Sequence, residues 1–349
     1  MKLTFAGDFS LGDCYLQQWE ARRPWSPQHQ RLIEDPFSFV RLLKPFFDDG
    51  RNGIINLETV LTKAVSSPLD GRKDFVGRDD PARTVSVLRA LGIYAVSLAN
   101  NHSRDYAEAG LLETMHHLAC GGIRFFGAGS KSGASAPLCI GEAGSRPVYV
   151  IGSMQYRTRY ATEYDFIAQH RQVGVDAFSA ASMTQRIRRL REDQPRAWIV
   201  VFPHWGRNYR RRDEAMRTAA ERWVQAGADL ILGHGAHALL ECECIGGVPV
   251  CYSLGNAVFN SPGRYAHYDM HPYSAIAHVE LDEAGCTLRL YPTVTDNRLT
   301  DFLVRPVQAA QAEACASAAM GRDFALQKDA LGWFMSPHLS CRERPHSAL

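Results

Sequence analysis

The chain has 349 residues, enough for one large domain or two ordinary ones. Hydrophobic residues make up 46% and charged residues 22%, a globular composition that excludes a disordered or low-complexity chain. The formal net charge of +2 excludes a strongly basic surface, so we expect no nucleic-acid partner.

Short apolar runs alternate with helical spacing over the first two-thirds of the chain, and the last third is rich in strand patterns. The strands are expected at residues 2–7, 53–58, 94–100, 123–129, 146–153, 196–206, 229–234, 248–256, 274–281 and 287–294. The helices are expected at 36–47, 81–92, 106–122 and 213–228. This order predicts an α/β protein whose sheet is partly parallel, with an antiparallel portion added.

The remaining segments predict loops and a tail. Residues 66–80 form a polar stretch that indicates a loop, and the chain after about residue 320 has an irregular pattern. A strand pattern begins directly at the N-terminus, and no apolar run approaches the roughly 20 residues that a membrane helix needs. We therefore expect a cytoplasmic protein without a membrane segment.

Five of the expected strands end in a residue that can bind a metal ion. In open α/β sheets, ligands bind at the carboxyl ends of the strands. The residues at these ends are Asp8; Asn56 and Glu58; Asn100, Asn101 and His102; His204; and His234 and His237. A mixture of Asp, Glu, Asn and His suits Mn²⁺, Fe²⁺ or Zn²⁺. No cysteine joins the set, which argues against a structural zinc site.

The order of six segments resembles the CapA-type poly-γ-glutamate (capsule) biosynthesis proteins, relatives of the calcineurin-like metallophosphoesterases. The segments are "FAGDFSLGD", "GIINLETVLT", "GIYAVSLANNHSRDYAEAGL", "VVFPHWGRNY", "AGADLILGHGAHALLE" and "VPVCYSLGNAVF". The resemblance implies a four-layer αββα sandwich of the metallo-dependent phosphatase type with mixed sheets. We expect this domain at residues 1–305 and a helical or irregular extension at 306–349.

The resemblance also implies a role for each strand-end residue. Asp8 and His237 would bind a first metal ion, and Glu58 would bridge it to a second. The second ion would be bound by Asn101, His204 and His234. His102 would be the acid/base residue, and Asp105 would orient it. One or two ions are therefore expected.

The chain departs from the family pattern at several positions. Ser10 stands where the phosphoesterases have the histidine of Asp-x-His, so the first metal position has fewer protein ligands. Asn208 replaces a glutamate of the CapA branch, and "GHGAH" replaces "GHHPH". CapA proteins carry a membrane anchor, and we expect none here.

The expected chemistry leaves three functions open. A bound metal ion and His102 would support hydrolysis of a γ-glutamyl-type amide or a phosphoester. The same groups would also support a peptide epimerase of a ribosomal-peptide (lasso-type) pathway, and the third possibility is a non-catalytic polymer-assembly factor. Arg207 and Asn56 are expected to bind an anionic small-molecule or peptide substrate, because guanidinium groups suit carboxylates and phosphates. The sequence leaves the oligomeric state open.

Overall fold

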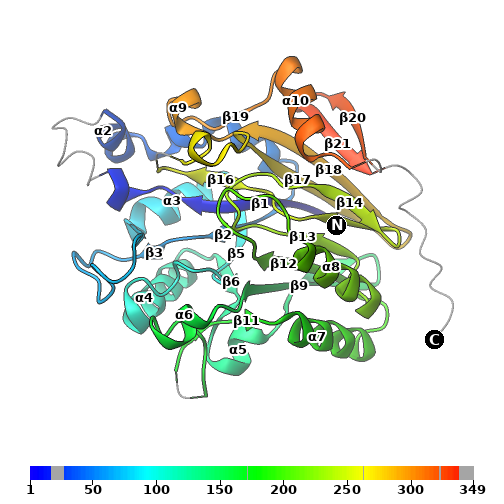
Figure 1. Ribbon diagram of the computed structural model, residues 1–349, viewed down its shortest axis with the longest axis horizontal. Coiled ribbons are helices and arrows are strands. Elements are labelled where there is room, and N and C mark those ends of the chain that lie inside the picture. Colours follow the sequence, from blue (N-terminus) through cyan, green and yellow to red (C-terminus); the bar gives the residue numbers. More distant parts are fainter. Residues whose placement is uncertain (17–26, 171, 262, 322–323, 338–349) are drawn as a thin grey trace.

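The computed structural model describes the chain except for residues 17–26, 171, 262, 322–323 and 338–349 (Figure 1). Its described strands form two large sheets, together with the two-stranded pairs β3–β4 and β7–β10. These pairs comprise Val60–Leu61 and Arg78–Asp79 (β3, β4), and Ala128–Gly129 and Gly174–Val175 (β7, β10).

The first sheet has a parallel half and an antiparallel half. Its order is β20-β21-β18-β17-β1-β2-β5-β6, with β16 paired to β1 and β19 to β18. The parallel strands are β1 (Lys2–Ser10), β2 (Asn52–Leu57), β5 (Ile93–Ser97), β6 (Arg124–Phe126) and β16 (Asn256–Phe259). The antiparallel strands are β17 (Tyr273–Leu281), β18 (Cys286–Val294), β19 (Arg305–Pro306), β20 (Phe324–Asp329) and β21 (Gly332–Pro337).

The second sheet has the order β11-β9-β12-β13-β15-β14, with β8 on β9. Its strands are β8 (Leu138–Ala143), β9 (Arg146–Gln155), β11 (Ala177–Phe178), β12 (Trp198–His204), β13 (Leu230–Leu232), β14 (Cys242–Ile245) and β15 (Val248–Cys251). β9, β12, β13 and β15 are parallel. Each sheet therefore has a group of parallel strands whose carboxyl ends can carry the residues of a site.

Helices cover the outer faces of both sheets. The larger ones are α3 (Pro81–Leu91), α4 (Ala107–Cys120), α7 (Ala180–Asp193), α8 (Glu214–Ala226) and α10 (Ala309–Ala319). The shorter ones are α2 (Pro27–Glu34), η1 (Pro36–Phe39), η2 (Arg41–Phe47), α5 (Lys131–Ser135), α6 (Thr158–Thr162), η3 (Ala266–Tyr268) and α9 (Asn297–Thr300). The ends of α3 are set by local chemistry, because the Asp80 side chain caps its first turn and Gly92 ends it at φ 88°.

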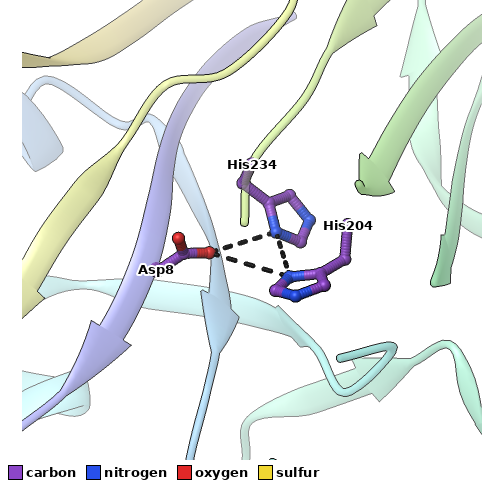
Figure 2. A group of neighbouring side chains, drawn as sticks. All are labelled: Asp8, His204 and His234. Atoms are coloured by element: carbon purple, nitrogen blue, oxygen red, sulfur yellow. Dashed lines mark hydrogen bonds and ion pairs between the residues drawn. The ribbon is translucent and has the colours of Figure 1, made fainter. Parts of the chain in front are cut away.

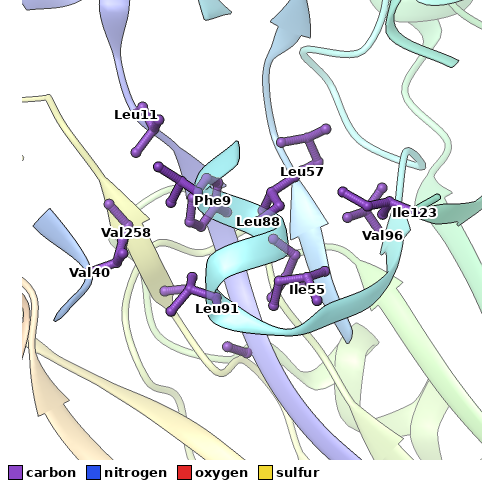
Figure 3. Close-up of a cluster of buried hydrophobic side chains, with 14 of the residues drawn as sticks. Phe9, Leu11, Val40, Ile55, Leu57, Leu88, Leu91, Val96, Ile123 and Val258 are labelled. Atoms are coloured by element: carbon purple, nitrogen blue, oxygen red, sulfur yellow. The ribbon is translucent and has the colours of Figure 1, made fainter. Parts of the chain in front are cut away.

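Successive side chains of the parallel strands point to opposite faces of each sheet, and this alternation produces the four layers of the sandwich. On β2, Ile54 faces the second sheet and Ile55 faces the helices. Leu88 and Leu91 of α3 pack on the Ile55 face (Figure 3). On β12, Val200 faces the first sheet and Val201 packs against α7 and α8. The expected four-layer αββα sandwich with mixed sheets is confirmed.

Three expected elements differ in detail. Residues 36–47 form two 3₁₀ segments instead of one α-helix, because Pro45 lies inside the run and lacks an N–H donor. The expected strand at 248–256 ends at Cys251, and the chain then crosses to the first sheet as β16. The tail after residue 320, expected to be irregular, contains the hairpin β20–β21; residues 338–349 of that tail lie outside the described part. The division at residue 305 stays a prediction.

Among the described residues, no helix combines the length and the apolar character that crossing a bilayer requires.

A buried histidine in the first sheet predicts acid sensitivity. Burial and the nearby charge of Arg51 lower the pKa of His278 to about 4, and its Nε2–H donates to the Phe46 carbonyl at 2.8 Å. This histidine takes up a proton near pH 6.5 when the chain is unfolded but only near pH 4 when it is folded. The stability contributed by neutral His278 is therefore present above pH 6.5 and lost as the pH falls toward 4.

We expect the free energy of unfolding to fall by about 2 kcal/mol from this group between pH 7.5 and 5. Urea unfolding at both pH values measures it, with His278→Gln as the comparison. An equal fall in the variant and the wild type would contradict the assignment.

Candidate metal centre

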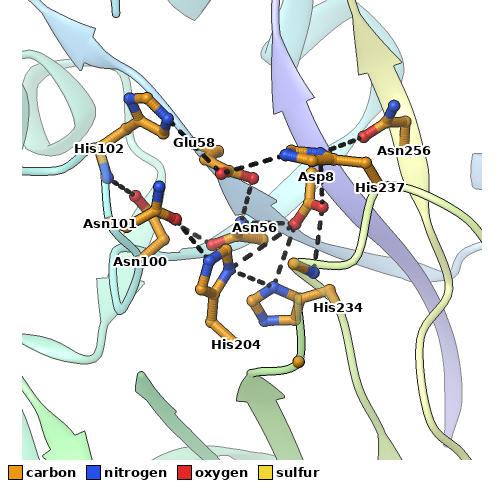
Figure 4. Close-up of polar contacts among 12 residues, drawn as sticks. Asp8, Asn56, Glu58, Asn100, Asn101, His102, His204, His234, His237 and Asn256 are labelled. Atoms are coloured by element: carbon orange, nitrogen blue, oxygen red, sulfur yellow. Dashed lines mark hydrogen bonds and ion pairs between the residues drawn. The ribbon is translucent and has the colours of Figure 1, made fainter. Parts of the chain in front are cut away.

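The predicted strand-end residues meet at one edge of the sandwich. Asp8 lies near the end of β1, Glu58 follows β2, and Asn101 follows β5 (Figure 4). His204 is the last residue of β12, and His234 follows β13. The two sheets thus contribute to one buried cluster, as the carboxyl-end rule predicts.

The first group of donor atoms consists of Asp8, His204 and His234 (Figure 2). The Nδ1 atoms of the two histidines are 3.1 Å apart, and Asp8 Oδ1 lies 3.2 Å from His234 Nδ1 and 3.9 Å from His204 Nδ1. Ligand atoms about 2.0–2.2 Å from one ion are about 3–3.6 Å apart. The group therefore has nearly the spacing that a divalent cation requires.

The second group consists of Asp8, Glu58 and His237. His237 Nδ1 lies 3.3 Å from Asp8 Oδ2, and His237 Nε2 lies 4.0 Å from Glu58 Oε1. Asp8 belongs to both groups, whereas Glu58 belongs to one. The bridging role expected for Glu58 stays a prediction.

Three asparagines hold the cluster in place. Asn56 donates to Asp8 Oδ1 at 2.9 Å and accepts from Asn100 at 3.0 Å. Asn100 Oδ1 in turn accepts from the backbone N–H of His102 at 2.9 Å. Asn101 Oδ1 contacts His204 Nε2 at 2.6 Å, on the ring nitrogen away from Asp8. His204 can therefore present Nδ1 to the first group or Nε2 beside Asn101.

Burial and mutual charge shape the ionisation of the cluster. Burial alone would raise the pKa of Asp8, but contacts with His234 and His237 hold it well below its usual value. Burial and the charge of Asp8 raise the pKa of Glu58 well above its usual value. Burial and the neighbouring His234 lower the pKa of His204, which keeps this imidazole neutral and able to bind a cation.

Two buried atoms in the cluster have no hydrogen-bond partner among the described residues. They are Glu58 Oε1 and His234 Nε2. A buried carboxylate oxygen without a partner is costly unless a donor or a cation faces it. The donor set, its spacing and this oxygen together fit a divalent metal ion.

His102 and Asp105 form a pair beside the cluster. Asp105 Oδ2 lies 2.6 Å from His102 Nδ1, and His102 Nε2 lies 3.9 Å from Glu58 Oε1. Lys73 forms a buried ion pair with Asp105. Burial lowers the pKa of Lys73, and burial followed by the charge of Lys73 lowers the pKa of His102.

The turn after β13 explains one departure from the family pattern. Gly235 has φ +99°, and its N–H donates to Asp8 Oδ2 at 3.1 Å. A Cβ on Gly235 would lie 2.8–3.0 Å from the His204 ring. His237 itself adopts φ 61°, so the turn curls both histidines toward Asp8. In this chain the middle position of "GHGAH" requires glycine.

Ser10 does not join either donor group. Its hydroxyl donates to Asp79 at 3.1 Å, and Asp79 also accepts from the backbone of Leu11 and Asp13. Ser10 thus anchors the loop after β1, consistent with the expected loss of a ligand at this position.

The cluster opens onto a cavity of about 1160 Å³. Asn101, His102, His204 and His237 line it. Six cationic residues also line it: Lys73, Arg78, Arg157, Arg159, Arg264 and Arg298. Asp70 and Asp74 are the acidic residues among its other lining groups. The excess of positive charge suits an anionic ligand.

The two expected substrate-binding residues lie elsewhere. Arg207 is exposed and does not line this cavity, and Asn56 is buried beneath Asp8. Arg157 and Arg159, which follow a strand pattern in "MQYRTRY", were open to prediction as anion-binding residues. Arg78, Arg264 and Arg298 lie in short elements and loops whose residue pattern carries no such signal. Lys73 was not predicted as a site residue, because it lies in the polar stretch 66–80, whose pattern indicates only a loop.

Comparisons with known proteins identify the family. The family model described as "Bacterial capsule synthesis protein PGA_cap" matches residues 2–261. The chain belongs to this family.

Its curated relatives carry related names. A "Probable polyglutamine synthesis accessory protein" of Mycobacterium tuberculosis is 29% identical over 220 residues, 61% of this chain and 57% of that protein. The "PGA biosynthesis protein CapA" of Bacillus subtilis is 30% identical over 180 residues, 51% of this chain and 45% of that protein. The chain thus spans about half the length of these relatives. A phosphatase structure from Mycoplasma pneumoniae matches at 10% identity and a TM-score of 0.39, covering 88% of this chain and 91% of that one.

Removal of the shared carboxylate should abolish metal binding. We expect near-stoichiometric metal in the wild-type protein after incubation with Mn²⁺, and at least about tenfold less in Asp8→Asn, because this residue belongs to both donor groups. Plasma mass spectrometry of protein purified without a histidine tag measures it. Asp48→Asn, an exposed carboxylate outside the cluster, is the control. A wild type that takes up no Mn²⁺, Fe²⁺ or Zn²⁺ would contradict the metal centre.

A single methyl group at Gly235 should also weaken metal binding. Gly235→Ala and Gly50→Ala both place a side chain at positive φ, which costs about 1–2 kcal/mol of stability. Only the Gly235 variant pushes on the His204 ring, since a Cβ at Gly50 meets nothing within 4 Å. We expect at least about tenfold weaker Mn²⁺ binding by calorimetry in Gly235→Ala alone. Equal affinities would show that this turn does not position His204.

Proposed function

We propose that this chain is a metal-dependent hydrolase that cleaves a γ-glutamyl-type amide or a phosphoester in an anionic substrate of capsule-type polymer metabolism. The observation that carries the proposal is the convergence of Asp8, Glu58, His204, His234 and His237 beside His102, at one end of a cationic cavity. The proposal concerns this chain and not the full-length relatives, because the chain spans only about half the length of each of them.

Some residues of the site would hold metal ions, and others would transfer protons. Asp8, His204 and His234 would hold one divalent ion, and Asp8, Glu58 and His237 a second, with Mn, Fe or Zn as candidates. Asn101 would contribute through the oxygen that faces His204. When bound, such an ion polarises a carbonyl or phosphoryl oxygen and lowers the pKa of a coordinated water.

His102 is placed to transfer a proton. Its Nδ1 is engaged by Asp105, which leaves Nε2 directed toward Glu58 and the cluster (Figure 4). A neutral imidazole in this position can accept a proton from an attacking water and return it to the leaving group. His102 also lines the cavity, so a substrate bound there would reach it.

The cavity favours an anionic substrate over a neutral one. Arg157, Arg264 and Arg298 line it, and no carboxylate among the described residues forms an ion pair with any of them. Guanidinium groups pair with carboxylates and phosphates through two parallel hydrogen bonds. The names of the relatives, which refer to PGA and polyglutamine synthesis, support the polymer context. A cytoplasmic location stays a prediction.

A specific observation keeps an assembly role as the second candidate. The mycobacterial relative is named as an accessory protein of synthesis. A non-catalytic partner would bind the polymer in the cationic cavity without cleaving it. The epimerase alternative predicts a different product, in which an α-carbon exchanges its proton and the chain length is unchanged.

Turnover by Mn²⁺-loaded protein tests the proposal. We expect cleavage of a γ-glutamyl oligopeptide or of bis-p-nitrophenyl phosphate, with kcat reduced about 10²- to 10⁴-fold in His102→Gln and metal content unchanged. His116→Gln, an exposed histidine on α4, is the control. Products are read by mass spectrometry in D₂O. Deuterium at an α-carbon without cleavage would favour the epimerase, and tight binding without either reaction would favour the assembly role.

A further inference from the structure

Lys73 reaches the site from the loop between β3 and β4. Its side chain is only 6% exposed, although the surrounding residues 66–80 are polar. The ammonium group lies near two aromatic rings, at 5.2 Å from the centroid of Phe166 and 5.8 Å from that of Tyr160. A lysine is rarely buried to this degree unless it is paired.

The partners of Lys73 all lie in residues 101–105, the segment that follows β5 and carries His102. Its Nζ forms the ion pair with Asp105 Oδ1, donates to the Asn101 carbonyl at 2.6 Å and lies 3.4 Å from His102 Nδ1. A single ammonium group therefore contacts the backbone of one expected metal ligand and both members of the His102–Asp105 pair. No other described side chain forms an ion pair or a hydrogen bond with Asp105 Oδ1.

Asp105 is surrounded by donors. Its Oδ2 accepts from the Gly77 N–H at 2.6 Å and faces His102 Nδ1 at 2.6 Å, while Oδ1 pairs with Lys73. Its backbone carbonyl accepts from the Ser67 hydroxyl. Lys73, Gly77 and Ser67 all belong to the same loop, so this loop fixes the carboxylate in position and orientation.

The geometry decides which nitrogen of His102 carries the proton. An ammonium group can only donate, and an ionised carboxylate can only accept. With Asp105 held as a carboxylate at 2.6 Å, His102 Nδ1 is the donor and Nε2 keeps its lone pair. Without a carboxylate fixed at Nδ1, neither nitrogen of the neutral ring would be held as the donor, and the proton would be distributed between Nδ1 and Nε2.

We propose that Lys73 is a positioning residue that fixes Asp105, so that His102 holds its proton on Nδ1 and presents an unprotonated Nε2 to the metal cluster. Lys73 acts through Asp105 and does not itself touch the reacting atoms. The kinetic consequence rests on the proposed hydrolase function, whereas the tautomer of His102 does not.

The first readout is therefore independent of turnover. Long-range ¹H–¹⁵N correlation spectra of the full chain distinguish the two imidazole tautomers, with His102→Gln used to assign the signal. We expect the Nδ1–H form in the wild type and a mixture of forms in Lys73→Met. Lys63→Met, an exposed lysine at the start of the same loop, is the matched control and should leave the spectrum unchanged.

A second variant distinguishes the loss of positioning from a loss of folding. Lys73→Met leaves the Asp105 carboxylate buried and unpaired, whereas the double variant Lys73→Met/Asp105→Asn removes both charges and is expected to fold. Both variants should lose the fixed tautomer. In a hydrolysis assay we expect kcat to fall about 10- to 100-fold with KM changed less than threefold, at unchanged Mn²⁺ content.

Chemical rescue distinguishes the effect of the Lys73 ammonium group from a general change in the structure of the loop. In Lys73→Ala, added ethylammonium should restore at least a tenth of the wild-type kcat by occupying the vacated site. An unchanged tautomer in Lys73→Met, with unchanged kcat, would overturn the proposal. If the wild type hydrolyses nothing, the proposed function fails, and the spectra alone then decide the role of Lys73.

Discussion

The structure depends on two buried carboxylates, Asp8 and Glu58, that lie in one cluster. Two negative charges in a desolvated space repel each other, so Glu58 shifts toward the protonated form and Asp8 relies on the histidines around it. A divalent cation bound between the two carboxylates would resolve this conflict, because it would supply positive charge to both of them. The asparagines, the turn at Gly235 and the loop carrying Lys73 all serve to hold the donor atoms around that position.

The sandwich architecture explains how such a cluster can be buried. β1 and β2 come from one sheet and β12 and β13 from the other, and the parallel strands of both sheets end at the same edge. Neither sheet alone supplies the whole cluster, since one contributes carboxylates and amides and the other contributes His204, His234 and His237. Packing of the two sheets therefore assembles the site, and the hydrophobic layer between them keeps it rigid.

The cationic cavity and the Lys73–Asp105 ion pair share one segment of the chain. The loop between β3 and β4 contributes to the cavity wall and also anchors Asp105. One segment thus contributes both to the wall of the cavity and to the contacts of Asp105. Ser10 departs from the phosphoesterase pattern and serves the loop after β1, whereas Gly235 departs from the CapA pattern and makes room for the His204 ring.

The sequence by itself determined the succession of strands and helices along the chain and most of the residues of the cluster, because hydrophobic periodicity and strand-end chemistry are local properties of the chain. It predicted that Asp8, Glu58, His204, His234 and His237 converge, since parallel strands share an edge. Only the tertiary structure decided that Asp8 belongs to both donor groups, that Arg207 lies outside the cavity and that Lys73 supports Asp105. These features depend on where loops from distant parts of the chain pack, and a polar loop carries no periodicity from which that packing can be predicted.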